Sequence, residues 1–275
     1  MTNRDVTLIQ PHGSTRGLGL REVWTYRDLL YFLAWRDLKV RYKQTVLGAA
    51  WAILQPLALM GVFVLVFHKV GRISTEGMPP AVFYYSGVVP WTFFASAVQQ
   101  GSNSLLINQS LITKVFFPRL LIPLAAVLVP LVDMAVSCLL LGGLMVYHGV
   151  TPTASIVWLP LWLLFGVATA IAITVGLAAM NVQFRDVRHA VPFLIQVGLF
   201  LSPVAYPVSA IPERWRLLYG LNPMSGVIEG FRWSVTGFGH PPGSELVLST
   251  GVTLVLLLLG VGYFRRVERS FADVI

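Results

Sequence analysis

The sequence has little charge and a single cysteine. Only 12% of its 275 residues are Asp, Glu, Lys or Arg, whereas 56% are hydrophobic. A soluble fold needs a charged exterior, and this chain has too few charged side chains to cover one. The one cysteine, Cys138, lies in an apolar run, so it can form neither an intramolecular disulfide nor a cysteine metal site. The composition therefore indicates an integral membrane protein.

Motifs of a catalytic centre are also missing. The sequence contains no G-x-x-x-x-G-K-[ST] phosphate loop, no HExxH, no CxxC and no GxSxG, and its five histidines are scattered. We therefore predict that this chain has no catalytic residues, no metal site and no cofactor of its own.

The net charge of +8 could indicate a nucleic-acid partner, but the positions of the charges argue for a membrane surface. Eight of the 20 Lys and Arg residues precede residue 46, and the others mostly flank apolar runs. We expect membrane lipids as partners and no nucleic acid. The N-terminal residues lack the pattern of a cleaved signal peptide, so we expect the first span to be retained.

Six apolar segments are long enough to cross a bilayer, which requires about 20 residues of helix. We therefore predict an all-α integral membrane protein with six transmembrane helices in a transmembrane domain of residues 46–264. The expected helices are 46–67, 81–100, 120–147, 156–180, 190–208 and 246–264.

The distribution of Lys and Arg predicts the orientation. Fifteen of them lie in the two terminal segments and in the 101–119 and 181–189 connections, and five lie in the other connections. Because cytoplasmic loops are enriched in these residues, both termini are expected in the cytoplasm. Residues 1–45 then form a cytoplasmic N-terminus and residues 265–275 a cytoplasmic tail.

Two segments are neither spans nor ordinary loops. Residues 21–43 mix aromatic and aliphatic side chains with charges, which is typical of an amphipathic helix in the headgroup plane; a cytoplasmic helix packed on a partner is the alternative. Residues 209–245, the outer segment, are too apolar for a free loop and are interrupted by Pro and Gly. We expect short re-entrant helices there, covering an outer mouth.

Polar residues recur at helical spacing on one face of each of the first two expected spans. They indicate either a hydrated conduit with aromatic platforms or polar packing between helices. The candidate conduit residues are Gln44, Trp51, Gln55, Tyr85, Thr92, Ser96 and Gln99.

Asp133 is the only acidic or basic residue in the six expected spans. Such a group can serve as a relay or a substrate contact. Because no span offers a basic partner, we favour a structural carboxylate that is neutral or hydrogen-bonded beside a Pro-bent helix. The energy for transport must then come from elsewhere.

Five segments resemble, in order, the membrane subunits of ABC-type polysaccharide exporters. The resemblance covers almost the whole chain beyond about residue 20. The segments are RDLKVRYKQTVLGAAWAILQPL (36–57), KVFFPRLLIPLA (114–125), NVQFRDVRHAVPFLIQ (181–196), LNPMSGVIEGFRW (221–233) and VERSFADVI (267–275).

The resemblance implies a homodimer of six-span subunits in the bacterial inner membrane, bound to two ATP-binding cassette subunits. ATP and Mg are bound by those partners, and the cargo is a lipid-linked polysaccharide such as O-antigen. It further implies ATPase-coupling segments at Ser104–Phe117, including Lys114, and at the Arg185, Asp186 and Arg188 turn.

Two more sets of candidate residues remain, and the first of them is implied by the resemblance. The helix expected at 21–43, which we call the interface helix, flanks the entry of the lipid carrier, whose pyrophosphate can meet Arg36, Lys39, Arg41 and Lys43. Topology and anionic-lipid contact are the alternative role of these four residues. In the outer segment, Glu229 and Arg232 are three residues apart and can neutralise each other in support of an external gate, together with Trp215 and Trp233.

Three alternative functions remain at this point. An ABC permease for a drug or a simple lipid shares the same architecture. An ion-coupled carrier is disfavoured by the single intramembrane carboxylate, and a membrane glycosyltransferase by the absence of DxD-like spacing among Asp28, Asp37 and Asp186.

Overall fold

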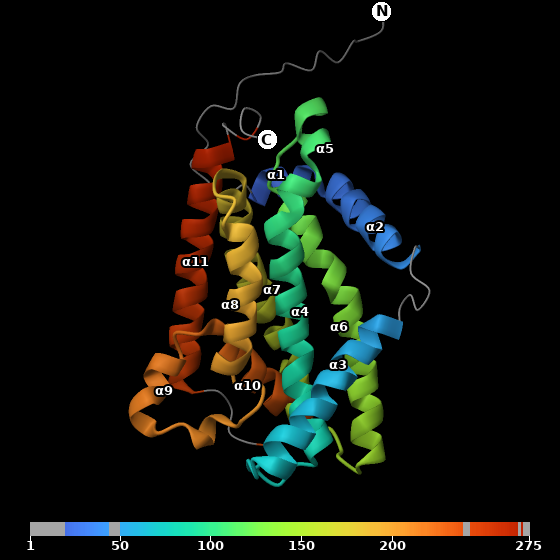
Figure 1. Cartoon of the computed structure of the whole chain (residues 1–275), viewed down its shortest axis with the longest axis vertical. Helices are drawn as coiled ribbons and strands as arrows, with labels where there is room; N and C mark the ends of the chain where they lie inside the picture. Colours follow the sequence, from blue (N-terminus) through green and yellow to red (C-terminus); the bar gives the residue numbers. More distant parts are fainter. Residues whose placement is uncertain (1–19, 44–49, 239–242, 269–270, 272–275) are drawn as a thin grey trace, which may run out of the picture.

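The computed structural model describes residues 20–43, 50–238, 243–268 and 271, and every regular element in that part of the chain is helical (Figure 1). This confirms the predicted all-α membrane fold. Five helical segments are long and apolar enough to cross a membrane: Ala50–Val70, Pro80–Ile107, Leu121–Tyr147, Ala154–Gln183 and Leu246–Glu268.

Two of these spans begin or end in a different helical geometry. The first consists of α3 (Ala50–Phe63), which continues as a π-helical segment, Val64–Val70. The fourth begins with a 3-10 turn, Ala154–Trp158, and continues as α7 (Leu159–Gln183). Residues 46–49 of the first expected span lie outside the described residues.

The fifth expected span, 190–208, differs from the structure. Helix α8 runs from Val187 to Leu201, and Ser202 has an extended backbone. The prolines at 203 and 207 follow directly and do not fit a helix interior. Fifteen residues of helix reach about 22 Å, less than the roughly 30 Å of the hydrocarbon core. The count of six spans therefore stays a prediction.

Helix α4 (Pro80–Ile107) lies at the centre of the bundle. It packs mainly against α6 (Leu121–Tyr147) and α7, and also against α3 and α8. It is the least apolar of the five spans and the most buried. A central position for the least apolar helix is expected in lipid, because polar groups turn toward other helices and the most apolar helices face the hydrocarbon.

Helices α1 (Leu20–Thr25) and α2 (Arg27–Lys43) occupy the segment predicted to form the interface helix, with a break at Tyr26. Its place in the headgroup plane stays a prediction, and we keep the name interface helix for this segment. They run obliquely across the upper end of the bundle in Figure 1, where α2 packs against α6. Leu33 is buried in an apolar cluster with residues of α5 (Gln109–Lys114) and of α11 (Ser244–Glu268). The aromatic side chains Trp24, Tyr31 and Phe32 are exposed.

The outer segment lies at the opposite end of the bundle (Figure 1). It contains α9 (Glu213–Tyr219) and α10 (Pro223–Thr236). Most of α10 is buried against α4, α7 and α11, so this part of the segment is packed protein rather than a free loop. Residues 239–242 lie outside the described part of the chain.

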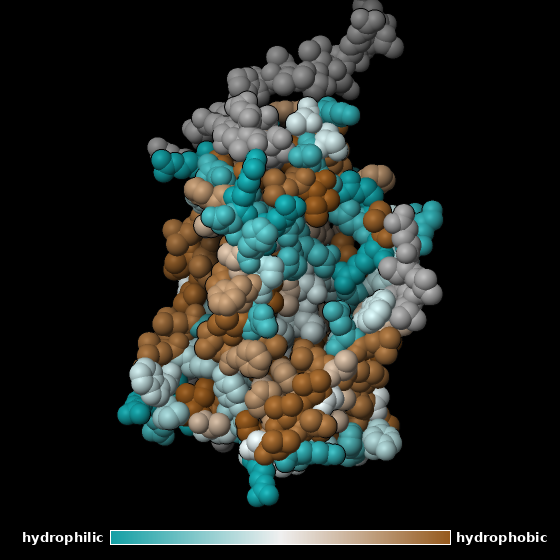
Figure 2. All heavy atoms as spheres, in the orientation of Figure 1, coloured by the Kyte–Doolittle hydropathy of each residue, from teal (hydrophilic) through white to brown (hydrophobic). Residues whose placement is uncertain are grey.

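The surface separates by polarity along the long axis. Figure 2 shows hydrophilic side chains around the upper end and part-way down the middle of this face, apolar side chains over much of the surface below, and hydrophilic side chains again at the lower end. The α5 connection, the start of α8 and the end of α11 share the upper end (Figure 1). These segments carry six of the 20 Lys and Arg residues, and α2 at the same end carries five more, as the positive-inside prediction requires of one membrane face.

Candidate functional site

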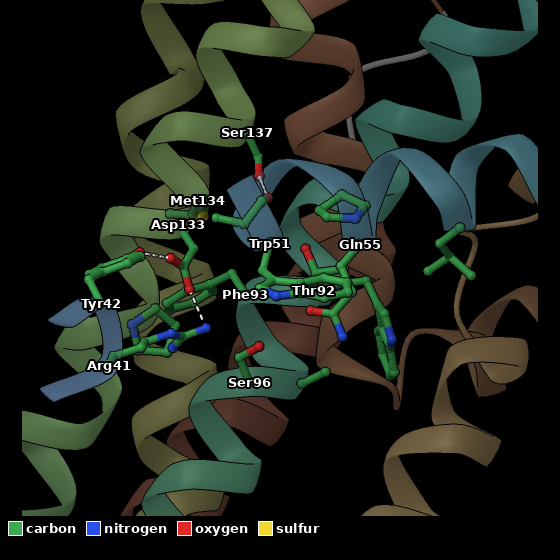
Figure 3. A pocket seen from close by; sticks show the side chains of 16 residues that line it. Arg41, Tyr42, Trp51, Gln55, Thr92, Phe93, Ser96, Asp133, Met134 and Ser137 are labelled. Carbon is green, nitrogen blue, oxygen red and sulfur yellow. Dashed lines mark hydrogen bonds and ion pairs between the residues drawn. The ribbon is translucent and has the colours of Figure 1, made fainter. Parts of the chain in front are cut away.

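A pocket of about 470 Å³ lies among α2, α3, α4 and α6 (Figure 3). We call it the membrane pocket. Three of the four helices are membrane spans, yet most of its lining is polar or aromatic. These residues are Arg41, Tyr42, Trp51, Gln55, Trp91, Thr92, Phe93, Ser96, Asp133 and Ser137.

Helical periodicity brings these side chains to one place. On α3, Trp51 and Gln55 are four residues apart, and on α4 so are Thr92 and Ser96, so each pair projects from one face. Helix α6 carries Asp133 and Ser137 at the same spacing. The Ser137 hydroxyl donates a hydrogen bond to the Ala52 carbonyl oxygen at 3.4 Å, which joins α6 to α3.

Asp133 is held by two residues of the interface helix (Figure 3). The Arg41 Nη2 lies 2.6 Å from the Asp133 Oδ2. The Tyr42 hydroxyl donates to the other carboxylate oxygen. Both charged side chains are largely withdrawn from solvent, with 33% of Arg41 and 16% of Asp133 exposed. The basic partner that no span could supply therefore comes from α2.

Tyr42 is a proton donor throughout the physiological pH range. Burial, together with the hydrogen bond to Asp133 and the negative charge of that carboxylate, raises the pKa of Tyr42 to about 12. The hydroxyl therefore stays protonated and can donate to a carboxylate, which accepts but does not donate.

A second cavity, of about 610 Å³, lies beside the end of α4. Its polar lining comprises Gln99, Gln100, Asn103 and Arg188, the last from the start of α8. The polar face of α4 thus serves two cavities: Thr92 and Ser96 line the membrane pocket, and Gln99 and Asn103 line the second cavity.

The conduit candidates separate into three groups. Trp51, Gln55, Thr92 and Ser96 lie together in the membrane pocket, and Gln99 lies in the second cavity. Tyr85 is fully buried in the core of the bundle instead. Gln44 lies outside the described residues.

The four basic candidates of the interface helix have different surroundings. Arg41 lines the membrane pocket. Arg36 donates to Asp37 and, at 2.7 Å, to the Asn108 side-chain oxygen at the junction of α4 and α5. The Lys39 ammonium lies 5.3 Å from the centre of the Trp35 ring, and Lys43 is exposed.

The coupling candidates lie at the upper end. Ser104 is buried within α4, where its hydroxyl donates to the Gly101 carbonyl, and Phe117 is buried after α5. Lys114 is exposed, as are Arg185, Asp186 and Arg188 in and beside the α7–α8 connection.

Arg232 is the most enclosed of the gate candidates. Its guanidinium lies 4.1 Å from the centre of the Phe83 ring and donates to the Pro203 carbonyl at 2.8 Å and to Ser86 at 3.3 Å. Glu229 and Trp233 are half-buried on the same helix, and Trp215 on α9 is exposed. Arg232 therefore ties α10 to α4 and to the segment after α8.

Sequence reasoning missed Tyr42, Trp91 and Phe93 as lining residues and left Asp133 and Ser137 out of the site. One signal was available for the last two, since they are four residues apart on the face of α6 that also carries Pro130.

The comparisons with known proteins agree with one another. The sequence profile of the ABC-2 type transporter family matches residues 28–236. The O-antigen export system permease protein RfbA of Myxococcus xanthus is 33% identical over 256 residues, which cover 92% of this chain and 98% of that protein. RfbA of Klebsiella pneumoniae is 28% identical over 90% of this chain and 95% of that protein. The polysialic acid transport protein KpsM of Escherichia coli is 27% identical over 86% and 92%, respectively.

Proposed function

The chain belongs to the ABC-2 type transporter family, and from this premise we propose that it is the permease subunit of an ATP-driven exporter of a lipid-linked polysaccharide. The resemblance noted in the sequence is thereby confirmed. The three relatives named above are permeases or transport proteins for O-antigen or polysialic acid, and the matches run nearly from end to end. A polymer of this class is therefore the cargo that we assign to this chain.

The membrane pocket is the observation that carries the proposal. Polar packing between helices would leave no space among these side chains, whereas here the rings of Trp51 and Trp91 and the hydrogen-bonding groups of Gln55, Thr92 and Ser96 surround a pocket of about 470 Å³. Aromatic rings stack on the apolar faces of sugars, and the amide and hydroxyl groups bond to sugar hydroxyls. The lining thus suits a saccharide that passes through the membrane.

We assign the ATPase-facing role to the upper end of the bundle. Lys114 and the Arg185, Asp186 and Arg188 turn are exposed there. Arg119 links the α5–α6 connection to the end of α11, since its guanidinium donates to the Glu268 carbonyl and lies 5.9 Å from the centre of the Phe271 ring. A connected platform of this kind can transmit the movement of a docked ATPase to the spans.

The assembly and its placement complete the proposal. Two copies of the chain pair with two ATP-binding cassette subunits, which bind ATP and Mg. The complex lies in the bacterial inner membrane with both termini in the cytoplasm, and the outer segment, 209–245, covers the external mouth. The positive-inside distribution of Lys and Arg supports this orientation.

Gene deletion and complementation test the proposed cargo. Cells that lack the gene should lose a surface polysaccharide and accumulate the same polymer inside, and the wild-type gene should restore export.

Trp51→Ala should export about fivefold less, because losing a stacking contact costs about 1 kcal/mol. Leu139→Ala, at a side chain of α6 that is 79% exposed, is the matched control and should export normally. An unchanged surface in the deletion strain would instead favour a drug or a simple lipid as cargo.

A further inference from the structure

Arg41 connects the two cavities. Its Nη2 contacts Asp133, which lines the membrane pocket, and its Nη1 donates to the Gln100 side-chain oxygen at 3.3 Å. Gln100 lines the second cavity. One guanidinium from the interface helix therefore touches α4 and α6 at the point where the polar face of α4 passes from one cavity to the other.

The pair of Arg41 and Asp133 is not needed to dock the interface helix. Leu33 is 3% exposed in the apolar cluster at the upper end, and Arg36 bonds to Asn108 at 2.7 Å. These contacts fix α2 independently. A carboxylate in a span is costly to desolvate, so a purely structural Asp133 would add a cost without a matching need.

The arrangement leaves Arg41 available to a stronger anion. A guanidinium has five N–H donors, and Arg41, which lines the membrane pocket, remains 33% exposed in its ion pair. A phosphate offers more negative charge than a carboxylate and can accept two parallel hydrogen bonds from Arg. In the absence of such a ligand, Asp133 neutralises Arg41 and Tyr42 holds the carboxylate in place.

We propose that Asp133 competes with the phosphate of the lipid anchor for Arg41 and thereby limits how tightly the site binds phosphate-bearing lipids. The proposal rests on the proposed function, because it assigns the ligand class of the same site. The phosphate that enters takes over Arg41, and the released guanidinium opens the passage between the two cavities. Asp133 is thus a positioning residue that acts through Arg41.

Binding of a short lipid diphosphate tests this competition. The permease with its ATPase partner is placed in phosphatidylcholine nanodiscs and titrated with geranylgeranyl diphosphate, with uncharged geranylgeraniol as the control ligand. Asp133→Asn should bind the diphosphate about tenfold more tightly, since no carboxylate charge opposes it, while geranylgeraniol should bind unchanged. Asp28→Asn, which removes a carboxylate charge from α2 at a side chain that is 98% exposed and lines neither cavity, is the matched control and should bind both ligands like the wild type.

A double substitution shows whether Asp133 acts through Arg41. Arg41→Gln should weaken diphosphate binding, and adding Asp133→Asn should then change nothing further. If Asp133→Asn does not assemble with the partner, Asp133→Ser takes its place in both experiments. Unchanged or weaker diphosphate binding in the Asp133 variant would overturn the proposal, and so would an equal gain for geranylgeraniol.

Two further measurements distinguish the lipid anchor from bilayer lipid as the source of the phosphate, and the role of Asp133 from the proposed function. If phosphatidylglycerol nanodiscs abolish the difference between Asp133→Asn and wild type, the phosphate at Arg41 comes from the bilayer, and the assignment to the lipid anchor is wrong; a persisting difference supports it. The export assay tests the proposed function by itself. Normal export by the wild type with no effect of Asp133→Asn on binding overturns only the role of Asp133.

Discussion

Arg232 shows how a single cation can fix the outer segment to the rest of the bundle. Its guanidinium satisfies the Pro203 carbonyl after α8 and lies over the Phe83 ring of α4, so three separate parts of the chain meet at one buried side chain. Cation–π contacts of this kind are worth about 2 kcal/mol when the cation is desolvated. The residue was expected to neutralise Glu229 on its own helix, and its role here extends to the packing between helices.

We predict that Arg232→Met lowers the free energy of unfolding by about 2 kcal/mol, because a buried carbonyl loses its donor and a cation–π contact is lost. Arg232→Lys should restore only part of this, since one ammonium cannot reproduce the planar set of donors. Thermal unfolding of the detergent-solubilised protein measures both. Arg214→Met, at an exposed residue of α9, is the control and should unfold like wild type; a loss as large as that of Arg232→Met would contradict the assignment.

Gly230 marks the close approach of α10 to the start of α7. A Cβ atom at this position would lie 2.2 Å from the Trp162 ring, which is only 4% exposed and therefore has little room to move. The absence of a side chain at residue 230 thus allows the two helices to pack, which explains the glycine without any requirement for unusual backbone angles.

Gly230→Ala should therefore destabilise the protein by about 1–3 kcal/mol through overpacking. Gly251→Ala is the matched control. Gly251 lies in α11, and a Cβ atom added there would meet nothing within 4 Å. That variant should be neutral or slightly stabilising because alanine favours helix. The measurement is again thermal unfolding in detergent, and equal melting temperatures for the two variants would rule out the close contact as the reason for the glycine.

At the scale of helices, the membrane environment decides what the sequence can predict. A bilayer requires long apolar helices and forbids open sheet edges, so composition and length sufficed to predict an all-α membrane fold. The same criteria do not decide whether α8 crosses the membrane, because its 15 residues of helix are shorter than a typical span. The partners of Asp133 could not be predicted, because Arg41 and Tyr42 lie on α2, 92 and 91 residues earlier in the chain. No pattern in the sequence of α6 indicates which segment packs on it.

The orientation of α8 has a direct test in the two connections that flank it. In a Cys138→Ser background, single cysteines replace Arg185 before α8 and Arg214 after it, both exposed positions. If α8 crosses the membrane, a thiol reagent that cannot cross the bilayer should label the residue-214 cysteine in intact cells and the residue-185 cysteine only after lysis. Labelling of both from one side would mean that α8 does not cross, and the six-span prediction would be wrong.

The whole molecule combines a pocket whose lining suits a saccharide with an exposed upper end, and its sequence contains no phosphate-binding loop. These two features belong together if the work of transport is done by a separate ATPase. Phe184, in the α7–α8 connection beside Arg185, is 55% exposed at that end. A large aromatic ring on a polar surface is typical of a contact with another protein, where aromatic residues contribute most of the binding energy.

Replacement of Phe184 by Ser should therefore weaken binding of the ATPase partner by about tenfold or more, since an aromatic anchor of an interface contributes about 1.4 kcal/mol or more. Phe200→Ser is a closely matched control, because Phe200 lies at the other end of α8, is 52% exposed, and is remote from the partner in the proposed orientation.

Co-purification with the ATPase subunit and ATP hydrolysis by the complex measure the effect. Both should fall for Phe184→Ser and stay unchanged for Phe200→Ser, whereas the purified chain alone should hydrolyse no ATP in any variant. Hydrolysis by the isolated chain, or equal losses at both positions, would contradict a partner-driven exporter whose motor docks at the end of the bundle that carries α5.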